Sequence, residues 1–388
     1  MQPKEFLMIP GPTPVPDSVL EALARDPMGH RTKEFSKVFM DATAGLKALA
    51  ECTSGDALIL TSSGTGAMEA AIANTISPGD KVLCLVSGVF GERWAKIAEA
   101  YGAQVERFTV ENGEAIGLDA LRDKLQADKG REVKAVTITH NETSTGVMND
   151  LQKIALAVRE HGALCIVDAV TSFGAAPIEM TAWGIDVMVA GSQKALMLPP
   201  GLAVIFMSDR AWEAEAKCKS PRFYFSLTKA KKSLEQETTP FTPNVSFVVA
   251  LKTSLDLMKG EGYRAIYARH DRMKKAVRAG VTGMGLKLFV QKETSASPTI
   301  TSIVPPSAVS VDAIRRTMKE RYNIRIADGQ DALKSKIFRI GHMGYVFERD
   351  ILMTLAALEA SLTELGHRCP SGIGVGSALA ALSEVGVR

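Results

Sequence analysis

The sequence predicts an α/β protein with a mainly parallel sheet of about seven strands, followed by a smaller α+β domain. The first observation is an alternation, between residues 57 and 207, of short apolar runs and helical stretches of about 10 to 15 residues. That alternation is typical of a parallel sheet covered by helices on both faces. The second observation is that, after residue 245, long helical stretches mix with a few shorter strand candidates.

The expected strands of the first domain are short and apolar, and they cover residues 57–60, 81–86, 104–108, 135–139, 164–167, 187–190 and 203–207. The helices expected between them cover 64–76, 92–101, 118–127 and 151–161. Between residues 208 and 244 the pattern loosens, and within it the breaker cluster Thr238-Thr-Pro-Phe-Thr-Pro243 indicates a loop. The C-terminal part predicts helices over 245–259, 263–281, 311–321 and 348–365 and strands over 286–290, 299–304 and 337–340.

The N-terminal segment Pro10-Gly-Pro-Thr-Pro-Val-Pro16 is neither helix nor central strand, because each proline fixes its backbone and lacks an N–H donor. An extended arm of this kind needs a surface on which to lie. We expect helices from Asp17 to about residue 26 and from 34 to 49. The predicted division is an arm over 1–20, a large domain over 21–250, a small domain over 251–366 and a flexible Gly-, Ala- and Ser-rich tail over 367–388.

Composition narrows the class of protein. The 388 residues are 46% hydrophobic and 23% charged, with a net charge of +3, which disfavours a nucleic-acid binder. The five cysteines are odd in number and none forms a C-x-x-C spacing, which indicates a reducing compartment. The start of the chain has no secretory h-region, and no apolar run reaches about 18 residues. We therefore expect a cytoplasmic protein without a membrane span.

Lys194 follows the apolar run 187–190 and a Gly-Ser turn, and the breaker Pro199-Pro200-Gly201 lies beyond it. An apolar setting lowers the pKa of a lysine, and a neutral amine can form a Schiff base with an aldehyde. The alternative is a surface lysine whose stem lies along apolar residues. The sequence alone leaves both readings of Lys194 open.

Asp168 ends another apolar run, 164–167. In an open α/β sheet, ligands bind outside the carboxyl ends of the strands, so Asp168 and Lys194 are expected to face one crevice. The alternative for Asp168 is a helix N-cap. A lysine together with an acidic partner for a pyridinium nitrogen suits pyridoxal phosphate.

Three further segments follow or form strand candidates. Thr61-Ser-Ser-Gly-Thr-Gly-Ala67 joins a strand to a helix, and its glycines and free N–H groups form a seat for a single phosphate. Phe90, after another strand, could stack on a flat ring or belong to ordinary packing. Arg339 lies inside an apolar strand, where a guanidinium pairs with a carboxylate of the substrate or of the protein.

As a set, these motifs resemble the fold type I, class V aminotransferases, and within them the alanine– and serine–glyoxylate branch. The resemblance covers roughly residues 5–365 in order and rests on Ser-Gly-Thr-Gly-Ala, Val-Phe-Gly-Glu-Arg, His-Asn-Glu-Thr-Ser-Thr-Gly-Val, Val-Asp-Ala-Val-Thr-Ser, Gly-Ser-Gln-Lys-Ala-Leu, Phe-Thr-Pro and Arg-Ile-Gly. Gly-Ser-Gln-Lys-Ala-Leu is the most diagnostic of them.

The resemblance implies a role for each matching residue. Lys194 would hold pyridoxal 5'-phosphate as an internal aldimine and move the proton, and Asp168 would keep the ring nitrogen protonated. Phe90 stands where this branch often has tryptophan, and would stack on the ring. The remaining implied residues are Ser63, Gly64, Thr65 and Gln193 for the phosphate, Thr143 near the ring hydroxyl, Thr239 and Thr242 for the phosphate of the neighbouring subunit, and Gly11 and Arg339 for the substrate.

The resemblance therefore implies a homodimeric aminotransferase with composite active sites and no metal. It would move an amino group from alanine or serine to a 2-oxo acid, with glyoxylate as the expected acceptor, by a ping-pong mechanism. Other class V chemistries remain as alternatives: an aminoethylphosphonate transaminase, a lyase or a desulfurase. A redox subunit of the soluble-hydrogenase type is a further alternative, although its clusters need grouped thiolates and these five cysteines are scattered. The sequence does not determine the amino donor.

Overall fold

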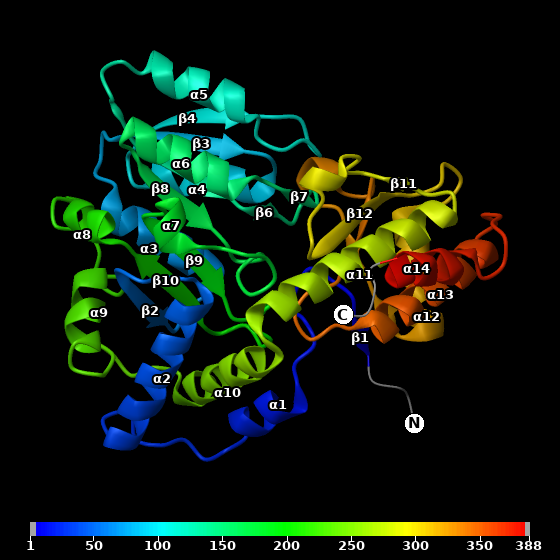
Figure 1. The fold of residues 1–388 in the computed structure, drawn as a ribbon, viewed down its shortest axis with the longest axis horizontal. Helices are drawn as coiled ribbons and strands as arrows, with labels where there is room; N and C mark the ends of the chain where they lie inside the picture. Colours follow the sequence, from blue (N-terminus) through cyan, green and yellow to red (C-terminus); the bar gives the residue numbers. More distant parts are fainter. Residues whose placement is uncertain (1–4, 385–388) are drawn as a thin grey trace.

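The computed structural model describes residues 5–384, which form a large lobe and a small lobe (Figure 1). The large lobe is built around a seven-stranded sheet in the order β2-β10-β9-β8-β5-β3-β4. Its strands are β2 (Asp56–Leu60), β3 (Lys81–Val86), β4 (Gln104–Thr109), β5 (Val133–Thr139), β8 (Leu164–Asp168), β9 (Val187–Gly191) and β10 (Ala203–Met207). Only β10 runs antiparallel to its neighbours, so the predicted mainly parallel sheet is confirmed.

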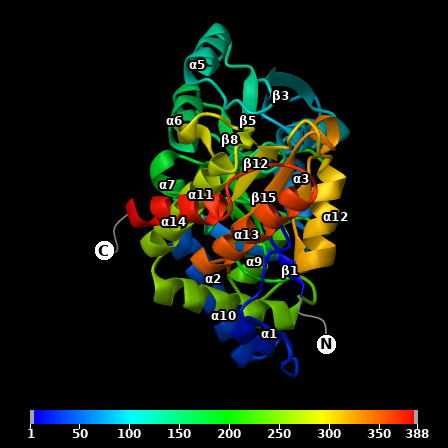
Figure 2. The same cartoon turned by 90° about the vertical axis from the view of Figure 1, so that its right-hand side faces the viewer.

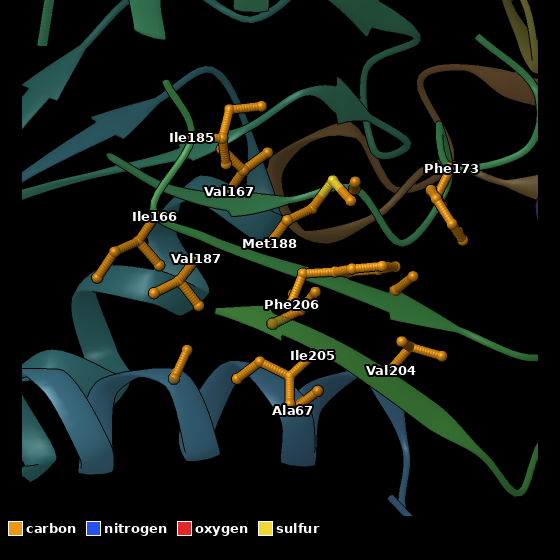
Figure 3. Packing of buried hydrophobic residues seen from close by; sticks show 14 of the residues in the cluster. Ala67, Ile166, Val167, Phe173, Ile185, Val187, Met188, Val204, Ile205 and Phe206 are labelled. Atoms are coloured by element: carbon orange, nitrogen blue, oxygen red, sulfur yellow. The ribbon is translucent and has the colours of Figure 1, made fainter. Parts of the chain in front are cut away.

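Helices cover the two faces of this sheet. They are α1 (Asp17–Leu23), α2 (Lys33–Leu49), α3 (Gly64–Thr75), α4 (Val89–Ala100), α5 (Leu118–Ala127), α6 (Leu151–His161), α7 (Met180–Trp183), α8 (Asp209–Glu215), α9 (Leu227–Leu234) and α10 (Val245–Glu261). The alanine-rich α3 packs against β9 and β10, and Figure 3 shows Ala67 of α3 beside Ile205 of β10. Small side chains let this helix lie close to the sheet, which brings its N-terminus to the strand ends.

The segment 208–244, in which the sequence pattern loosens, contains two short helices, α8 and α9. Each begins at a serine whose hydroxyl accepts a backbone N–H of the first turn: Ser208 from Ala211 and Ser226 from Lys229. These local caps, rather than apolar periodicity, set the starts of the two helices.

The small lobe has a four-stranded antiparallel sheet in the order β11-β12-β15-β14. Its elements are α11 (Tyr263–Gly283), β11 (Lys287–Leu288), η1 (Glu293–Ser295), β12 (Ile300–Val304), α12 (Val311–Tyr322), β13 (Ile324–Arg325), β14 (Ala327–Asp328), η2 (Asp331–Leu333), β15 (Phe338–Gly341), α13 (Glu348–Glu364) and α14 (Ile373–Glu384). A short antiparallel pair, β6 (Asn141–Glu142) and β7 (Val147–Met148), extends from the large lobe toward it.

The N-terminal arm lies on the small lobe of its own chain. Strand β1 (Phe6–Leu7) pairs in parallel with β13, and the buried Met8 accepts a hydrogen bond from Gly341 N through its carbonyl. Figure 2 shows β1 beside the helices of this lobe. Residues 1–4 of the predicted arm lie outside the described residues.

The tail that the sequence predicts to be flexible from residue 367 contains helix α14, which packs against α11 and α13 (Figure 2). The physical reason is its small residues. A Cβ on Gly280 of α11 would lie 2.8 Å from the Gly374 carbonyl oxygen, and Ala378 is fully buried. The composition that suggested mobility thus permits close helix packing. Residues 385–388 are outside the described part of the chain.

The two hydrophobic cores meet along α11. The core of the large lobe extends through α10 to Ile266, whereas the core of the small lobe includes Met273 and later residues of α11. The packing therefore changes within α11, later than residue 250, and the domain division given above stays a prediction. None of the helices in residues 5–384 combines the length and apolarity that a membrane crossing requires.

Candidate active site

The chemistry-bearing residues lie where the strands of the large sheet end. Asp168 is the last residue of β8, Lys194 lies three residues after β9, and Ser63 joins β2 to α3. The parallel strands put these carboxyl ends at one edge of the sheet. The sheet order places β8 directly beside β9, so the aspartate and the lysine are on neighbouring strands.

The Lys194 amine is held by the N-terminal arm. Its Nζ donates to the Pro10 carbonyl at 2.5 Å, and the Lys194 carbonyl accepts the Thr13 hydroxyl at 2.9 Å. Burial lowers the pKa of Lys194 to about 8, although the Asp168 charge acts in the opposite direction. This lysine therefore does not extend into solvent, and a substantial part of its amine is neutral near pH 8.

Gly11 lies against the same amine. Its φ is +133°, and an added Cβ would lie 2.5 Å from Lys194 Nζ and 2.9 Å from Cδ. Any side chain at this position would displace the lysine. The predicted nearness of Gly11 to the reacting centre thus has a steric reason within one chain.

Asp168 is a buried carboxylate with one unused oxygen. Its Oδ1 accepts from Val170 N at 2.8 Å, whereas Oδ2 has no hydrogen-bond partner among residues 5–384. Burial raises the pKa of Asp168 to about 7, and the Glu142 charge adds to this. The residues after Asp168 form a turn rather than a helix, so the alternative of a helix N-cap is wrong.

The loop before α3 has the properties of a phosphate seat. The Ser63 hydroxyl caps the helix by accepting Gly66 N at 3.2 Å, and the N–H groups of Gly64 and Thr65 have no intrahelical acceptor. Gln193 Oε1 is buried and has no hydrogen-bond partner among residues 5–384, but as an acceptor this oxygen does not itself bind a phosphate. The free N–H groups and the positive end of the α3 dipole are what suit a monophosphate.

Phe90 is the second residue of α4 and is half-buried, not part of the closed core. The Arg93 guanidinium lies 4.5 Å from the centre of its ring, and Arg93 Nη1 also donates to the Thr65 hydroxyl at 2.9 Å. Arg93 therefore connects the aromatic ring to the phosphate seat. Its charge lowers the pKa of both Asp168 and Lys194, which indicates that it faces the same site.

Arg339, on β15, is 5% exposed and is held by neutral acceptors. Its Nε donates to the Asp328 carbonyl at 2.7 Å, and its Nη1 donates to the Thr143 carbonyl at 2.7 Å and to Gln330 Oε1 at 3.1 Å. No carboxylate within residues 5–384 forms an ion pair with it, and Nη2 makes no hydrogen bond there. Burial lowers the pKa of Arg339 to about 10, so it is cationic near neutral pH and has a donor available for an anion.

Thr239 and Thr242 are not brought to this site within the chain. The Thr239 hydroxyl donates to the Phe241 carbonyl at 2.7 Å, and Thr242 is exposed. Both line a hollow with Thr61 beside the edge strand β2, on the outer side of the phosphate seat. Their implied contact with a neighbouring subunit stays a prediction.

Sequence reasoning missed three contributors: the Pro10 carbonyl, Arg93 and Glu142. Arg93 and Glu142 lie inside quoted motifs, Val-Phe-Gly-Glu-Arg and His-Asn-Glu-Thr-Ser, but their partners are far away along the chain. Only the relative placement of α4 and β6 brings them to the site.

The available groups fit pyridoxal phosphate. An amine with a depressed pKa can bind an aldehyde, the unused Asp168 Oδ2 can accept from a ring nitrogen, and Phe90 offers an aromatic face. The N-terminus of α3, with its free N–H groups, offers a seat for the phosphate. The predicted site residues near Lys194 are thus mutually consistent, and their individual roles remain predictions.

Comparisons with known proteins agree with this geometry. The family described as "Aminotransferase class-V" matches residues 6–351. A protein of Anabaena cylindrica named soluble hydrogenase 42 kDa subunit is 50% identical over 97% of this chain and 98% of its own. The serine–glyoxylate aminotransferase of Hyphomicrobium methylovorum is 38% identical over 96% and 93%. The crystal structure of pyridoxamine–pyruvate aminotransferase from Mesorhizobium loti is similar with a TM-score of 0.94 and 32% identity over 99% and 100% of the chains.

Proposed function

The chain belongs to the class V aminotransferases, and we propose that it moves the amino group of alanine or serine to glyoxylate in two half-reactions at one site. The observation that carries this proposal is the juxtaposition, on neighbouring strand ends, of a lysine with a pKa of about 8 and an aspartate with an unused oxygen. A binding protein without catalysis has no need of this pair.

Pyridoxal phosphate, when bound, supplies an aldehyde for the amino group and a ring that accepts carbanion charge. Lys194 Nζ would hold the cofactor through its aldehyde, and the same amine could move a proton at the substrate α-carbon. Asp168 Oδ2 would accept a hydrogen bond from a protonated ring nitrogen. The Pro10 carbonyl accepts a hydrogen bond from Nζ and so orients the amine.

The setting of Arg339 supports the proposal that both half-reactions share one site. An amino acid and a 2-oxo acid both have a carboxylate next to the reacting carbon. The guanidinium is fixed by three neutral acceptors and keeps Nη2 free, so the same donor can bind either carboxylate. A ping-pong reaction requires one binding group that accepts the carboxylate of each substrate in turn.

Glyoxylate as acceptor is supported by the name of the Hyphomicrobium relative, whereas the Mesorhizobium structure is named for pyruvate. The donor is not fixed by the residues described. A screen of alanine, serine and aminoethylphosphonate as donors, against glyoxylate and pyruvate as acceptors, tests the proposal directly. Substantial turnover of aminoethylphosphonate alone, or release of sulfur from cysteine, would favour the other class V chemistries.

The name of the Anabaena relative raises the redox alternative again. Thiolate clusters need several cysteines gathered at one place. No group of three or more His, Cys, Asp or Glu residues that could hold a metal ion occurs within residues 5–384. The scattered cysteines therefore give no support to the redox alternative.

The decisive variant is Lys194→Ala. We expect it to fold, to bind the cofactor without a covalent bond and to transaminate very poorly, because no other group replaces the buried amine. Lys96→Ala, at an exposed position on α4, is the matched control and should behave as wild type. Borohydride trapping followed by peptide mass analysis should give a labelled Lys194 in wild type and in the control. Turnover near the wild-type rate in Lys194→Ala would refute the assignment.

We further propose a homodimer that works in the cytoplasm, with Thr239 and Thr242 directed to the partner's site. Phe223 and Tyr224 are 70% and 49% exposed, and Phe241 packs against both of them. Aromatic side chains left in solvent next to this segment suit a protein interface. Light scattering that finds a fully active monomer at low concentration would contradict the dimer.

A further inference from the structure

Glu142 is a fully buried carboxylate that the reaction described above does not use. Its four hydrogen bonds come from neutral donors: Phe90 N at 3.0 Å, Gly91 N at 3.1 Å, Ser144 N at 3.2 Å and the Ser144 hydroxyl at 2.5 Å. No ion pair to Glu142 occurs in the described part of the chain. All four groups donate, so they match an ionised carboxylate, which accepts only, and they oppose the burial that raises the pKa of Glu142. A buried charge of this kind is costly unless its hydrogen bonds are complete.

The carboxylate caps helix α4 from another segment of the chain. The N-cap of α4 is Gly88, which has no side chain to accept the free N–H groups of the first turn. Ser144 Oγ accepts Val89 N at 3.0 Å, and Glu142 takes the next two, beginning with Phe90. A Cβ on Gly88 would lie 2.4 Å from Ser144 Oγ and 2.5 Å from Glu142 Cγ, so glycine leaves the space that this cap requires.

Glu142 is also linked, through its neighbour Thr143, to Arg339, the proposed binding group for the substrate carboxylate. Thr143 follows Glu142 in the chain, and its carbonyl accepts Arg339 Nη1 at 2.7 Å. Because the Glu142 side chain also binds Ser144 on the other side of Thr143, the Thr143 carbonyl has little freedom to turn. One carboxylate therefore fixes both the Phe90 backbone and the acceptor that orients Arg339.

We propose that Glu142 is a positioning residue that holds the Phe90 ring and the Arg339 clamp in a fixed relation across the site. It contacts neither substrate nor cofactor and acts through α4 and Thr143. The inference rests on the proposed function, since the distance between Phe90 and Arg339 affects catalysis only if one cofactor–substrate complex contacts both residues.

The test is Glu142→Gln, which keeps the side-chain length but replaces one accepting oxygen by a donor that faces other donors. We expect the Michaelis constants of both the amino acid and the 2-oxo acid to rise at least about 10-fold. Near-ultraviolet circular dichroism of the bound cofactor should change, because the ring wall moves. In protein stripped of cofactor, hydrogen exchange of the peptide 88–94 should accelerate. Borohydride should still trap the cofactor at Lys194.

Asp186→Asn is the matched control. Asp186 is also a buried carboxylate, which accepts Cys165 N at 2.9 Å and the Ser208 hydroxyl at 2.9 Å and, unlike Glu142, pairs with Arg210 Nη1 at 3.2 Å. It precedes β9 and so lies at the opposite end of that strand from the site. This variant should lower the melting temperature while leaving the Michaelis constants and the cofactor dichroism unchanged.

A second variant leaves the Glu142 carboxylate intact but fills the space beside it. Gly88→Ala should displace Glu142 from α4 and reproduce the higher Michaelis constants and the altered dichroism. If Glu142→Gln or Gly88→Ala only lowers the melting temperature, as Asp186→Asn does, the positioning role is overturned. Wild-type protein in which borohydride traps nothing at Lys194 would instead overturn the proposed function itself.

Discussion

The pKa of Lys194 is the property on which the proposed chemistry depends most directly. Burial lowers it to about 8, from about 10.4 for a lysine in solvent. At pH 7.5 roughly one-quarter of such amines are neutral, compared with about one in a thousand for an exposed lysine. The advantage in reactive amine is therefore on the order of 200-fold.

The measurement uses protein stripped of cofactor and mixed briefly with pyridoxal phosphate between pH 6 and 10.5. Borohydride then fixes the lysines that have reacted, and peptide mass analysis gives the labelling of Lys194 relative to the exposed Lys96 in the same sample. Because the ionisation of the reagent affects both lysines equally, the ratio isolates the difference between their amines. We expect the Lys194 labelling to level off above a pH of about 8.

A second substitution tests the direction in which Asp168 shifts the pKa of Lys194. The Asp168 carboxylate raises the pKa of Lys194, against the larger effect of burial. Asp168→Asn should therefore move the Lys194 midpoint to lower pH. A Lys194 midpoint near about 10.4, the value of a lysine in solvent, or a shift to higher pH in Asp168→Asn, would refute the reasoning.

Two further predictions concern other residues. Arg339→Lys should lower the catalytic efficiency at least about 10-fold with both amino donor and oxo-acid acceptor, because lysine cannot keep the neutral contacts and still reach the substrate; unchanged kinetics beside a lower melting temperature would show that Arg339 only joins structural elements. Burial lowers the pKa of His342 to about 3. As the pH falls below about 6.5, the imidazole therefore binds a proton in the unfolded chain but not in the folded one, which lowers the free energy of unfolding. In urea titrations at pH 6.5 and 5.0, His342→Gln should lose less unfolding free energy than wild type by about 2 kcal/mol, and equal losses would contradict this.

Most of the sheet could be predicted from the sequence because β3, β5, β8, β9 and β10 are largely buried and read as mainly apolar runs. The site could be predicted in part because Asp168 ends one such run and Ser63 and Lys194 lie three residues after two strands, and parallel topology gathers strand ends at one edge. Their proximity needed no knowledge of side-chain packing.

What could not be predicted depends on contacts between segments that are distant in the chain. Glu142 caps α4 from 51 residues beyond Gly91, and no local pattern marks a cap supplied by another element. Helix α14 looked like a mobile tail because its Gly and Ala residues have little apolar periodicity. Its order comes from the matching small residues of α11, among them Gly280 and Gly283.

The N-terminal arm shows how such distant contacts join the two lobes at the site. On β15, Gly341 lies two residues after Arg339, and its N–H donates to the Met8 carbonyl at 2.9 Å. A Cβ on Gly341 would lie 2.1 Å from the Ile9 carbonyl oxygen, so the absence of a side chain lets the arm cross this strand. The next residue, Pro10, holds the Lys194 amine. The strand that carries the carboxylate clamp thus also anchors the segment that positions the lysine. Arg339 is on the small lobe and Lys194 is on the large one, and the arm contacts both. A shift of the small lobe would therefore move Arg339 and, through the arm, also change the contacts of the Lys194 amine.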